Sequence, residues 1–162
     1  MVAAVATIDL RRVVPDDRAF LRAVYGSTRW EELEPTGWMD EQKHAFLDHQ
    51  FEAQDVYYRE HYEGATYDVI VVDGFPAGRL YVARWEEEIR IMDIALLPTE
   101  RGKGVGTMLL RELQDEATAA GKRVTIHVEH ENPAMAWYER LGFRRVEDRI
   151  PYVLMEWLPR PR

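Results

Sequence analysis

The chain has 162 residues, a length that fits a single domain spanning 1–162 with a substantial core. Hydrophobic residues make up 46% and charged residues 31%, which is ordinary for a globular protein and argues against intrinsic disorder. There is no cysteine, so disulfides, thiolate zinc sites and a cysteine nucleophile are excluded, and no metal is expected. This composition suits the reducing cytoplasm, where we expect the protein to be located.

Acidic side chains outnumber basic ones, 29 to 21, which gives a formal charge of −8. Such a field repels phosphate backbones, so we expect no nucleic acid partner. It attracts cationic molecules such as amines, although it also serves plain solubility. No apolar run approaches membrane-spanning length, so no membrane is expected as a partner. Met1–Leu10 has no basic region before its short apolar stretch and contains Asp9, which predicts a first strand and not a signal peptide.

The first half of the chain predicts a strand, two helices and three further strands. In chain order these are a strand at Val5–Val13, helices from Pro15 to about Tyr25 and from Asp40 to about Tyr62, and strands at Tyr67–Val72, Ala77–Trp85 and Glu88–Leu97. Asp40 is expected to cap its helix. Three consecutive strands without helices between them predict antiparallel pairing.

The second half alternates helices with strands. A long helix has a buried stripe of Val105, Leu109, Leu113 and Ala117, four residues apart, and ends at Gly121. Then follow a strand at Arg123–Val128, a short helix from Asn132 to Gly142, and strands at Phe143–Val146 and Tyr152–Trp157. Strand–helix–strand units predict some parallel pairing, so the expected class is α/β or α+β with a mixed sheet.

A glycine-rich loop joins the strand that ends before Pro98 to this long helix. It holds three glycines in five residues, Gly102, Gly104 and Gly106. Glycines let the backbone turn tightly, and the N–H groups of the helix's first turn then form an anion site suited to a diphosphate. Arg101 and Lys103 would reinforce it. The spacing matches neither the P-loop nor the dinucleotide fingerprint. The alternative is a turn that binds nothing.

Two segments together resemble one family. The segment from Arg101 to Gly106 resembles the Arg/Gln-x-x-Gly-x-Gly/Ala motif of the GNAT superfamily of acyl-CoA-dependent N-acyltransferases, and Ile94-Ala95-Leu96 with Pro98 matches its lead-in strand. Further on, the segment from Asn132 to Phe143 resembles the family's Asn…Ala…Leu-Tyr…Gly-Phe segment. The resemblance implies a GNAT-like domain with a mixed sheet of about seven strands flanked by about four helices.

The resemblance also implies acetyl-CoA as co-substrate. In this family the backbone of the loop binds the coenzyme A diphosphate, the preceding strand pairs with pantetheine, and an asparagine touches pantetheine. These roles carry over to Arg101, Gly102, Lys103, Gly104, Val105, Gly106 and Thr107, to Ile94, Ala95 and Leu96, and to Asn132. Asn132 followed by Pro133 is equally typical of a helix N-cap, and the two roles are compatible.

By the same resemblance, Tyr138 donates a proton to the leaving thiolate, the alternative being a packed core tyrosine. The amine must lose a proton before it attacks. On the strand at Arg123–Val128, His127 and Glu129 share one face and are the first two candidates for the base, with Asp93 or a water chain as alternatives. A structural histidine is the plainer interpretation of His127.

The acceptor is expected to be an amine of a small molecule or peptide. This amine is expected to attack the acetyl group of acetyl-CoA directly. Aromatic and acidic residues are frequent in the first third of the chain and could hold a cationic amine, although a solvated helix face with core aromatics explains any single one of them better. They are Trp30, Glu31, Glu32, Glu34, Trp38, Tyr57, Tyr58, Glu60 and Tyr62. Dimers are frequent in the family, so a homodimer stays open.

Three other functions are compatible with parts of the pattern. One is a non-catalytic acyl-CoA-binding or sensing domain, which would need neither Tyr138 nor a base. Another is a nucleotide-binding protein of a different class. The third is a toxin-like acetyltransferase acting on charged RNA adducts, for which Arg144, Arg145 and Arg149 are a local basic patch.

Overall fold

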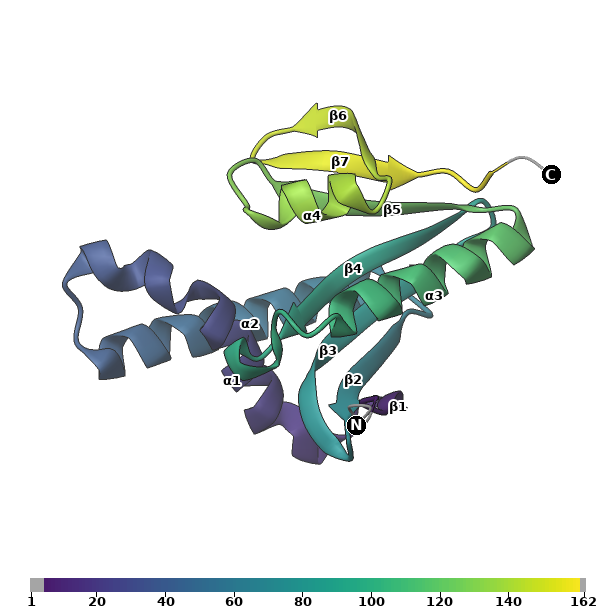
Figure 1. Ribbon diagram of the computed structural model, residues 1–162. Coiled ribbons are helices and arrows are strands. Elements are labelled where there is room, and N and C mark those ends of the chain that lie inside the picture. The colour runs from purple at the N-terminus through teal and green to yellow at the C-terminus, as the bar shows by residue number, and fades with distance from the viewer. Residues whose placement is uncertain (1–4, 161–162) are drawn as a thin grey trace. The chain divides into compact units, whose positions relative to one another are not determined.

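The computed structural model describes residues 5–160. These residues form seven strands, in the sheet order β1-β2-β3-β4-β5-β7-β6, and four α-helices (Figure 1). The strands are β1 (Ile8–Arg12), β2 (Thr66–Val72), β3 (Phe75–Arg84), β4 (Glu88–Leu96), β5 (Arg123–Glu129), β6 (Arg144–Arg149) and β7 (Tyr152–Trp157). The helices are α1 (Arg18–Arg29), α2 (Asp40–His61), α3 (Val105–Ala120) and α4 (Ala134–Arg140).

The sheet is mixed. β4 and β5 pair in parallel, whereas β1–β2, β5–β7 and β6–β7 are antiparallel. The last strand of the chain, β7, lies between β5 and β6. The mixed sheet with its helices confirms the predicted α/β class.

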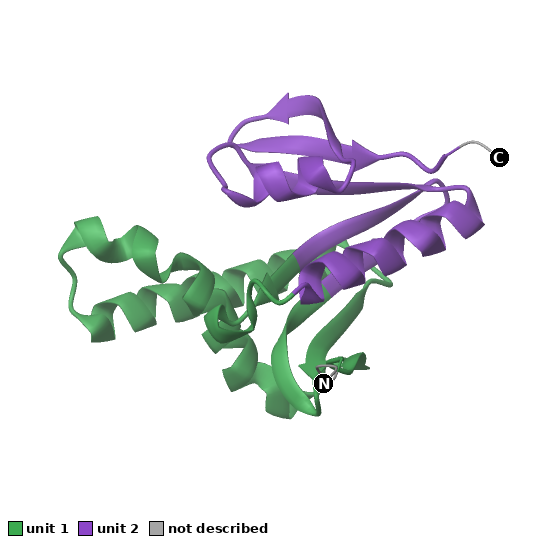
Figure 2. Ribbon diagram, viewed as in Figure 1, with its two compact units in different colours: residues 1–80, 94–103 green, residues 81–93, 104–162 purple. Residues whose placement is uncertain are grey.

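The chain divides into two compact units, shown in green and purple in Figure 2. Unit 1 comprises Met1–Leu80 and Ile94–Lys103, and unit 2 comprises Tyr81–Asp93 and Gly104–Arg162. β3 and β4 each contribute residues to both units.

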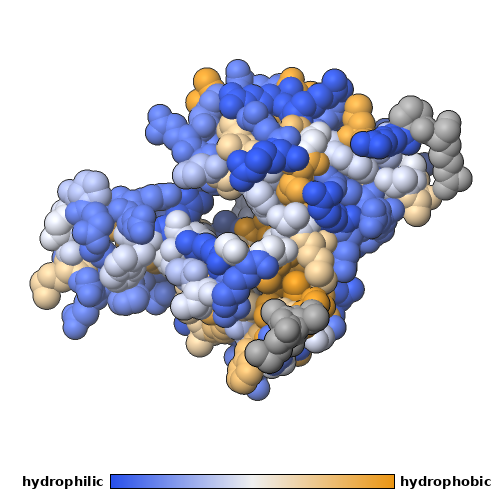
Figure 3. All heavy atoms as spheres, viewed as in Figure 1, coloured by the Kyte–Doolittle hydropathy of each residue, from blue (hydrophilic) through white to orange (hydrophobic). Residues whose placement is uncertain are grey.

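Unit 1 is built around the hairpin of α1 and α2, which lie side by side (Figure 1). A short 3₁₀ helix at Trp30–Thr36 joins them and ends at Gly37, whose φ of 68° is left-handed. The buried core of the hairpin is Leu21, Tyr25, Leu33, Leu47 and Phe51. In the view of Figure 3 the surface over these helices is mainly hydrophilic, as expected for helices that bury one face only.

Unit 2 packs α3 against β5. The predicted stripe of Val105, Leu109, Leu113 and Ala117 is buried, as are Val124, Ile126 and Val128 on β5. α3 ends at Gly121 in the left-handed conformation, with φ 69°. The apolar periodicity therefore predicted the buried face of α3, and Gly121 predicted where the helix ends.

Most predicted elements are present with shifted ends. β1 is shorter than the strand predicted at Val5–Val13, and residues 1–4, which precede that strand, lie outside the described residues. The first helix runs on to Arg29. Asp40 is the first residue of α2 and not its cap, because the N–H of Met39 donates to Gln42 Oε1 at 2.9 Å. The 3₁₀ helix at Trp30–Thr36 was not predicted, since its turns have no apolar period.

Candidate functional site

In unit 1, the last residues of β4 run unusually close to β3. A Cβ atom on Gly78 of β3 would lie 2.1 Å from the carbonyl oxygen of Ala95 and 3.0 Å from the Cα of Leu96. Just beyond, the N–H of Leu97 donates to the carbonyl of Ala77 at 2.8 Å. Only glycine fits at position 78, and it sets the path of the segment Ile94–Leu96.

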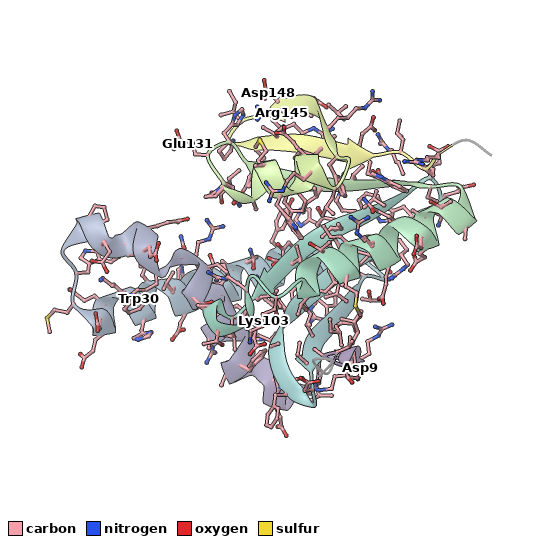
Figure 4. The ribbon with its side chains drawn as sticks, viewed as in Figure 1. Asp9, Trp30, Lys103, Glu131, Arg145 and Asp148 are labelled. Atoms are coloured by element: carbon pink, nitrogen blue, oxygen red, sulfur yellow. The ribbon has the colours of Figure 1, made fainter. Side chains whose placement is uncertain are left out.

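Arg101 ties the loop back to the strand. Its Nε donates to the carbonyl oxygen of Leu96 at 3.0 Å, within unit 1. Lys103 is exposed and its Nζ lies 3.7 Å from Glu100 Oε2, on the loop before α3 (Figure 4). An exposed ion pair of this kind is weak, so it does not prevent Lys103 from contacting an anionic ligand.

The glycines of the loop have two different roles. Gly102 and Gly104 have φ angles of 75° and 83°, a left-handed conformation that side chains other than glycine adopt only with strain. A Cβ on either would meet no atom within 4 Å. Gly106 is helical, and it is glycine because of packing: a Cβ there would lie 3.2 Å from Cζ2 of Trp137.

α3 begins with uncapped backbone donors. Gly104 precedes the helix and makes no side-chain cap, and the N–H of Met108 is bonded to the carbonyl of Gly104 at 3.0 Å. The N–H groups of the three preceding residues come before the helical ladder starts. With the partial positive charge of a helix N-terminus, they form a donor set suited to phosphate oxygens.

Asn132 starts α4. Its Oδ1 accepts from the N–H of Ala134 at 2.9 Å, and its carbonyl accepts from the N–H of Met135 at 3.0 Å. The capping role predicted from Asn132-Pro133 is therefore present in structure. This hydrogen bond uses Oδ1 only, so the side-chain NH₂ group can still make the predicted contact to pantetheine.

Tyr138 lies inside unit 2. Its ring contacts Trp137 at 4.9 Å and Phe143 at 5.7 Å between centroids, and only 5% of the residue is exposed. Burial raises the pKa of Tyr138, and the negative charge of Asp93 raises it further. The phenol therefore keeps its proton at neutral pH, and Asp93 is close enough to act on it electrostatically.

His127 lies beyond the last pair of the β4–β5 ladder, which runs from Glu88–Arg123 to Ile91–Ile126. Its Nδ1 is 3.3 Å from Arg90 Nη1, and its Nε2 is 3.1 Å from Arg149 Nη1. Burial lowers the pKa of His127, and the charges of these two arginines lower it further. A neutral imidazole has one lone pair in its ring plane, so only one arginine can donate to it at a time.

Comparison with known proteins identifies the family to which the chain belongs. Residues 27–143 match the model of the "Acetyltransferase (GNAT) family". The chain belongs to the GNAT acetyltransferase family. A streptothricin acetyltransferase from Streptomyces lavendulae is 34% identical over 85 residues, which are 50% of this chain and 45% of that protein. The match therefore spans less than half of the length of this curated relative.

Two solved structures share the fold of this GNAT protein. PaiA N-acetyltransferase from Thermoplasma acidophilum, solved in complex with coenzyme A, is 15% identical with a TM-score of 0.70, over 94% of this chain and 99% of that one. An acetyltransferase from Thermus thermophilus is 23% identical with a TM-score of 0.64, over 93% of this chain and 95% of that one. Together with the family model, they confirm the predicted resemblance.

The residues of the predicted site are divided between the two units of this GNAT protein. Unit 1 holds Ile94–Leu96 and Arg101–Lys103, and unit 2 holds Gly104–Thr107 together with His127, Glu129, Asn132 and Tyr138. Within residues 5–160, no group of at least three His, Asp or Glu side chains is arranged to hold a metal ion. None of the helices that the structure describes has the length and apolar content of a membrane span.

Sequence reasoning missed several residues that lie beside the candidate site residues. Arg90 is buried and its Nε donates to Thr125 Oγ1 at 2.7 Å, and Thr125 in turn donates to Glu88 Oε2 at 2.7 Å. An arginine inside the apolar run at 88–97 was the signal for this chain of bonds. Gly78 inside a strand signalled a close backbone approach. Trp137 carried no signal of its own.

Replacing Gly78 by alanine is expected to destabilise the protein by about 1–3 kcal/mol, because the new Cβ overlaps the backbone of β4. Chemical denaturation followed by circular dichroism measures this. Gly26→Ala is the matched control, since its Cβ meets only Leu47 Cδ1 at an ordinary 3.8 Å. A Gly78→Ala variant as stable as the control would contradict the proposed constraint.

Proposed function

We propose that this chain is an N-acetyltransferase that moves the acetyl group of acetyl-CoA to an amine of a small molecule or peptide by direct attack. The observation that carries the proposal is the start of α3, where Gly104 in the left-handed conformation leads into uncapped backbone donors. Membership of the GNAT family and the coenzyme A complex of the Thermoplasma neighbour support it. A cytoplasmic location is part of the proposal.

The diphosphate of the coenzyme fits the loop chemically. Backbone N–H groups of the first turn of α3 donate hydrogen bonds to anionic oxygens, and the cationic side chains of Arg101 and Lys103 add charge attraction. The residues assigned to this contact are Arg101, Gly102, Lys103, Gly104, Val105, Gly106 and Thr107. An open space of at least 4 Å where a Gly104 side chain would stand supports the assignment.

The backbone of Ile94–Leu96 is assigned to the pantetheine arm, which would pair with it as an added strand. One N–H group of this segment would polarise the thioester carbonyl. The carbonyl of Leu96 already accepts from Arg101 Nε, so Arg101 links the diphosphate loop to the strand that holds the arm. Asn132 is assigned to the same arm through its amide NH₂.

The thioester supplies the acetyl electrophile. The neutral amine nitrogen attacks its carbonyl carbon, a C–N bond forms and the C–S bond breaks. The sulfur leaves with a proton from Tyr138, and the proton lost by the amine goes to a base of the enzyme and thence back to the phenol. Tyr138 suits the donor role because burial keeps it protonated at the pH where a thiolate forms.

The base is one of three side chains, and their surroundings differ. His127 is neutral, as a base must be, but arginines face both of its ring nitrogens and make protonation unfavourable. Glu129 lies on the same strand, opposite Tyr152 in the β5–β7 register. The negative charge of Asp93 raises the pKa of Tyr138, which supports a role for Asp93 together with the proposed donor. We place Asp93 first, with His127 and Glu129 as the alternatives.

A small-molecule amine is the acceptor class that the relatives favour. The curated relative from Streptomyces is a streptothricin acetyltransferase, although this chain matches less than half of its length. The formal charge of −8 would help to attract a cationic amine. If the protein binds coenzyme A but turns over no amine, it is a coenzyme-sensing domain and not an enzyme.

Coenzyme A is expected to bind the wild-type protein, and Gly104→Glu is expected to abolish this binding because a carboxylate then occupies the anion site. Isothermal titration with coenzyme A measures the affinity, and thiol release from acetyl-CoA with an amine panel measures the transfer. Gly74→Glu is the matched control, since its φ of 85° imposes the same backbone strain and its Cβ also meets no atom within 4 Å. Equal binding by the two variants would refute the loop's role.

Tyr138→Phe is expected to lower kcat about 100-fold while coenzyme A affinity changes less than about twofold, because only the proton donor is lost. Steady-state kinetics and titration separate the two quantities. Tyr152→Phe, on β7 of the same unit, serves as the control. Unchanged turnover in Tyr138→Phe would move the donor to another group.

Asp93→Asn is expected to lower kcat/KM about 100-fold at pH 7, with the loss shrinking as the pH rises, because bulk solvent then deprotonates the amine. The pH profiles of His127→Gln and Glu129→Gln are measured beside it. A loss in Asp93→Asn that is the same at pH 7 and at pH 9.5 would mean that Asp93 has a structural role only. The same pH-dependent loss in one of the other variants would assign the base there.

A further inference from the structure

Trp137 on α4 makes two contacts with the first turn of α3, both within unit 2. Its six-membered ring lies against Gly106, where a Cβ would be 3.2 Å from Cζ2 and 3.3 Å from Cη2. Its Nε1 donates a hydrogen bond to Thr107 Oγ1 at 3.0 Å. One indole therefore contacts two successive residues of the turn assigned to the coenzyme diphosphate.

The hydrogen bond between them has a fixed direction. An indole N–H only donates, so Thr107 Oγ1 must be the acceptor. A hydroxyl group has one proton and two lone pairs, and the indole occupies one lone pair. The proton of Thr107 must then point away from Trp137. At the first turn of a helix, whose own N–H groups attract anions, a hydroxyl oriented this way is a donor to a phosphate oxygen.

We propose that Trp137 is a positioning residue for the coenzyme: it orients the Thr107 hydroxyl as a donor to the diphosphate and holds the first turn of α3 in place. The proposal rests on the proposed function, since it assigns a role within the same site. The indole acts through Thr107 and Gly106, with no contact of its own to the coenzyme.

The identity of Gly106 supports this pairing independently. Its backbone is helical, so unlike Gly102 and Gly104 it has no left-handed angle that calls for glycine. The indole ring of Trp137 occupies the space beside Gly106 instead. A Cβ atom at position 106 would lie closer to this ring than an ordinary van der Waals contact. Gly106 and Trp137 are thus complementary in shape, and the fit places Nε1 opposite Thr107.

The same indole is next to the proposed proton donor. The rings of Trp137 and Tyr138 are 4.9 Å apart between centroids. Trp137 therefore contacts Thr107, which is assigned to the diphosphate, and Tyr138, which is assigned to the sulfur. A change at Trp137 that removes only the N–H should affect the first of these and leave the second in place.

The test is a double-mutant cycle on coenzyme A affinity, measured by isothermal titration. Trp137→Phe keeps an aromatic ring but removes the N–H, and Thr107→Val removes the hydroxyl. Each single variant is expected to bind coenzyme A about fivefold to tenfold more weakly, the loss typical of one hydrogen bond. The double variant is expected to bind no more weakly than the weaker single variant, because both changes remove the same interaction. Thr107→Ser, which restores the hydroxyl, is expected to recover most of the affinity.

Two controls separate positioning from general damage. Pantetheine lacks the diphosphate, so its affinity is expected to be equal in wild type, Trp137→Phe and Thr107→Val. Trp157→Phe alters another indole that packs on a glycine, since a Cβ on Gly142 would lie 3.1 Å from Trp157 Cδ1. This variant is expected to bind coenzyme A as the wild-type protein does.

Coenzyme A affinity that is unchanged in Trp137→Phe overturns the inference, and so do additive losses in the double variant or an equal loss for pantetheine. If Trp137→Phe does not fold, Thr107→Val compared with Thr107→Ser carries the test alone: equal affinities overturn the role of the hydroxyl. A wild-type protein that does not bind coenzyme A at all would instead refute the proposed function.

Discussion

The backbone donors at the start of α3 are the feature on which the rest of the site depends. The helical hydrogen-bond ladder begins with the N–H of Met108, so the N–H groups of the three residues before it, in the first turn of the helix, have no partner within the helix. The left-handed φ angle of Gly104 directs the chain into the first turn of α3. The buried side chain of Val105 packs in the core and holds this turn in place. Because the donors are main-chain atoms, their placement depends on the packing of α3 and not on side-chain rotamers.

The fold was predictable where a pattern repeats over many residues. The buried stripe of α3, its end at Gly121 and the bounds of β7 followed from periodicity and turn residues. The 3₁₀ helix at Trp30–Thr36 was not predictable in this way, because its turns present no continuous apolar face. Asp40 shows the same limit at a helix end. Aspartate favours the N-cap position, but Asp40 is the first helical residue, one position after the cap. The side chain of Gln42 accepts from the N–H of Met39.

The site was predictable as a motif but not as a set of individual roles. Three glycines in five residues indicated a loop for an anion, yet two of them are needed for their angles and Gly106 for its contact with a distant indole. A strand alternation placed His127 on the polar face correctly, but no local pattern shows that arginines from β4 and β6 approach both of its nitrogens. Contacts between residues far apart in the sequence decide these roles, and a single sequence does not encode them locally.

Electrostatics couples the two proton transfers of the proposed reaction. The charge of Asp93 helps to keep Tyr138 protonated before the reaction, when a premature loss of that proton would disable the donor. When Asp93 takes the proton of the attacking amine, its charge is neutralised and one of the two causes of the raised pKa disappears. Tyr138 then releases its proton more readily, at the step when the sulfur needs it. In the proposed reaction, this pairing of a buried phenol with a carboxylate favours deprotonation of the amine before protonation of the thiolate.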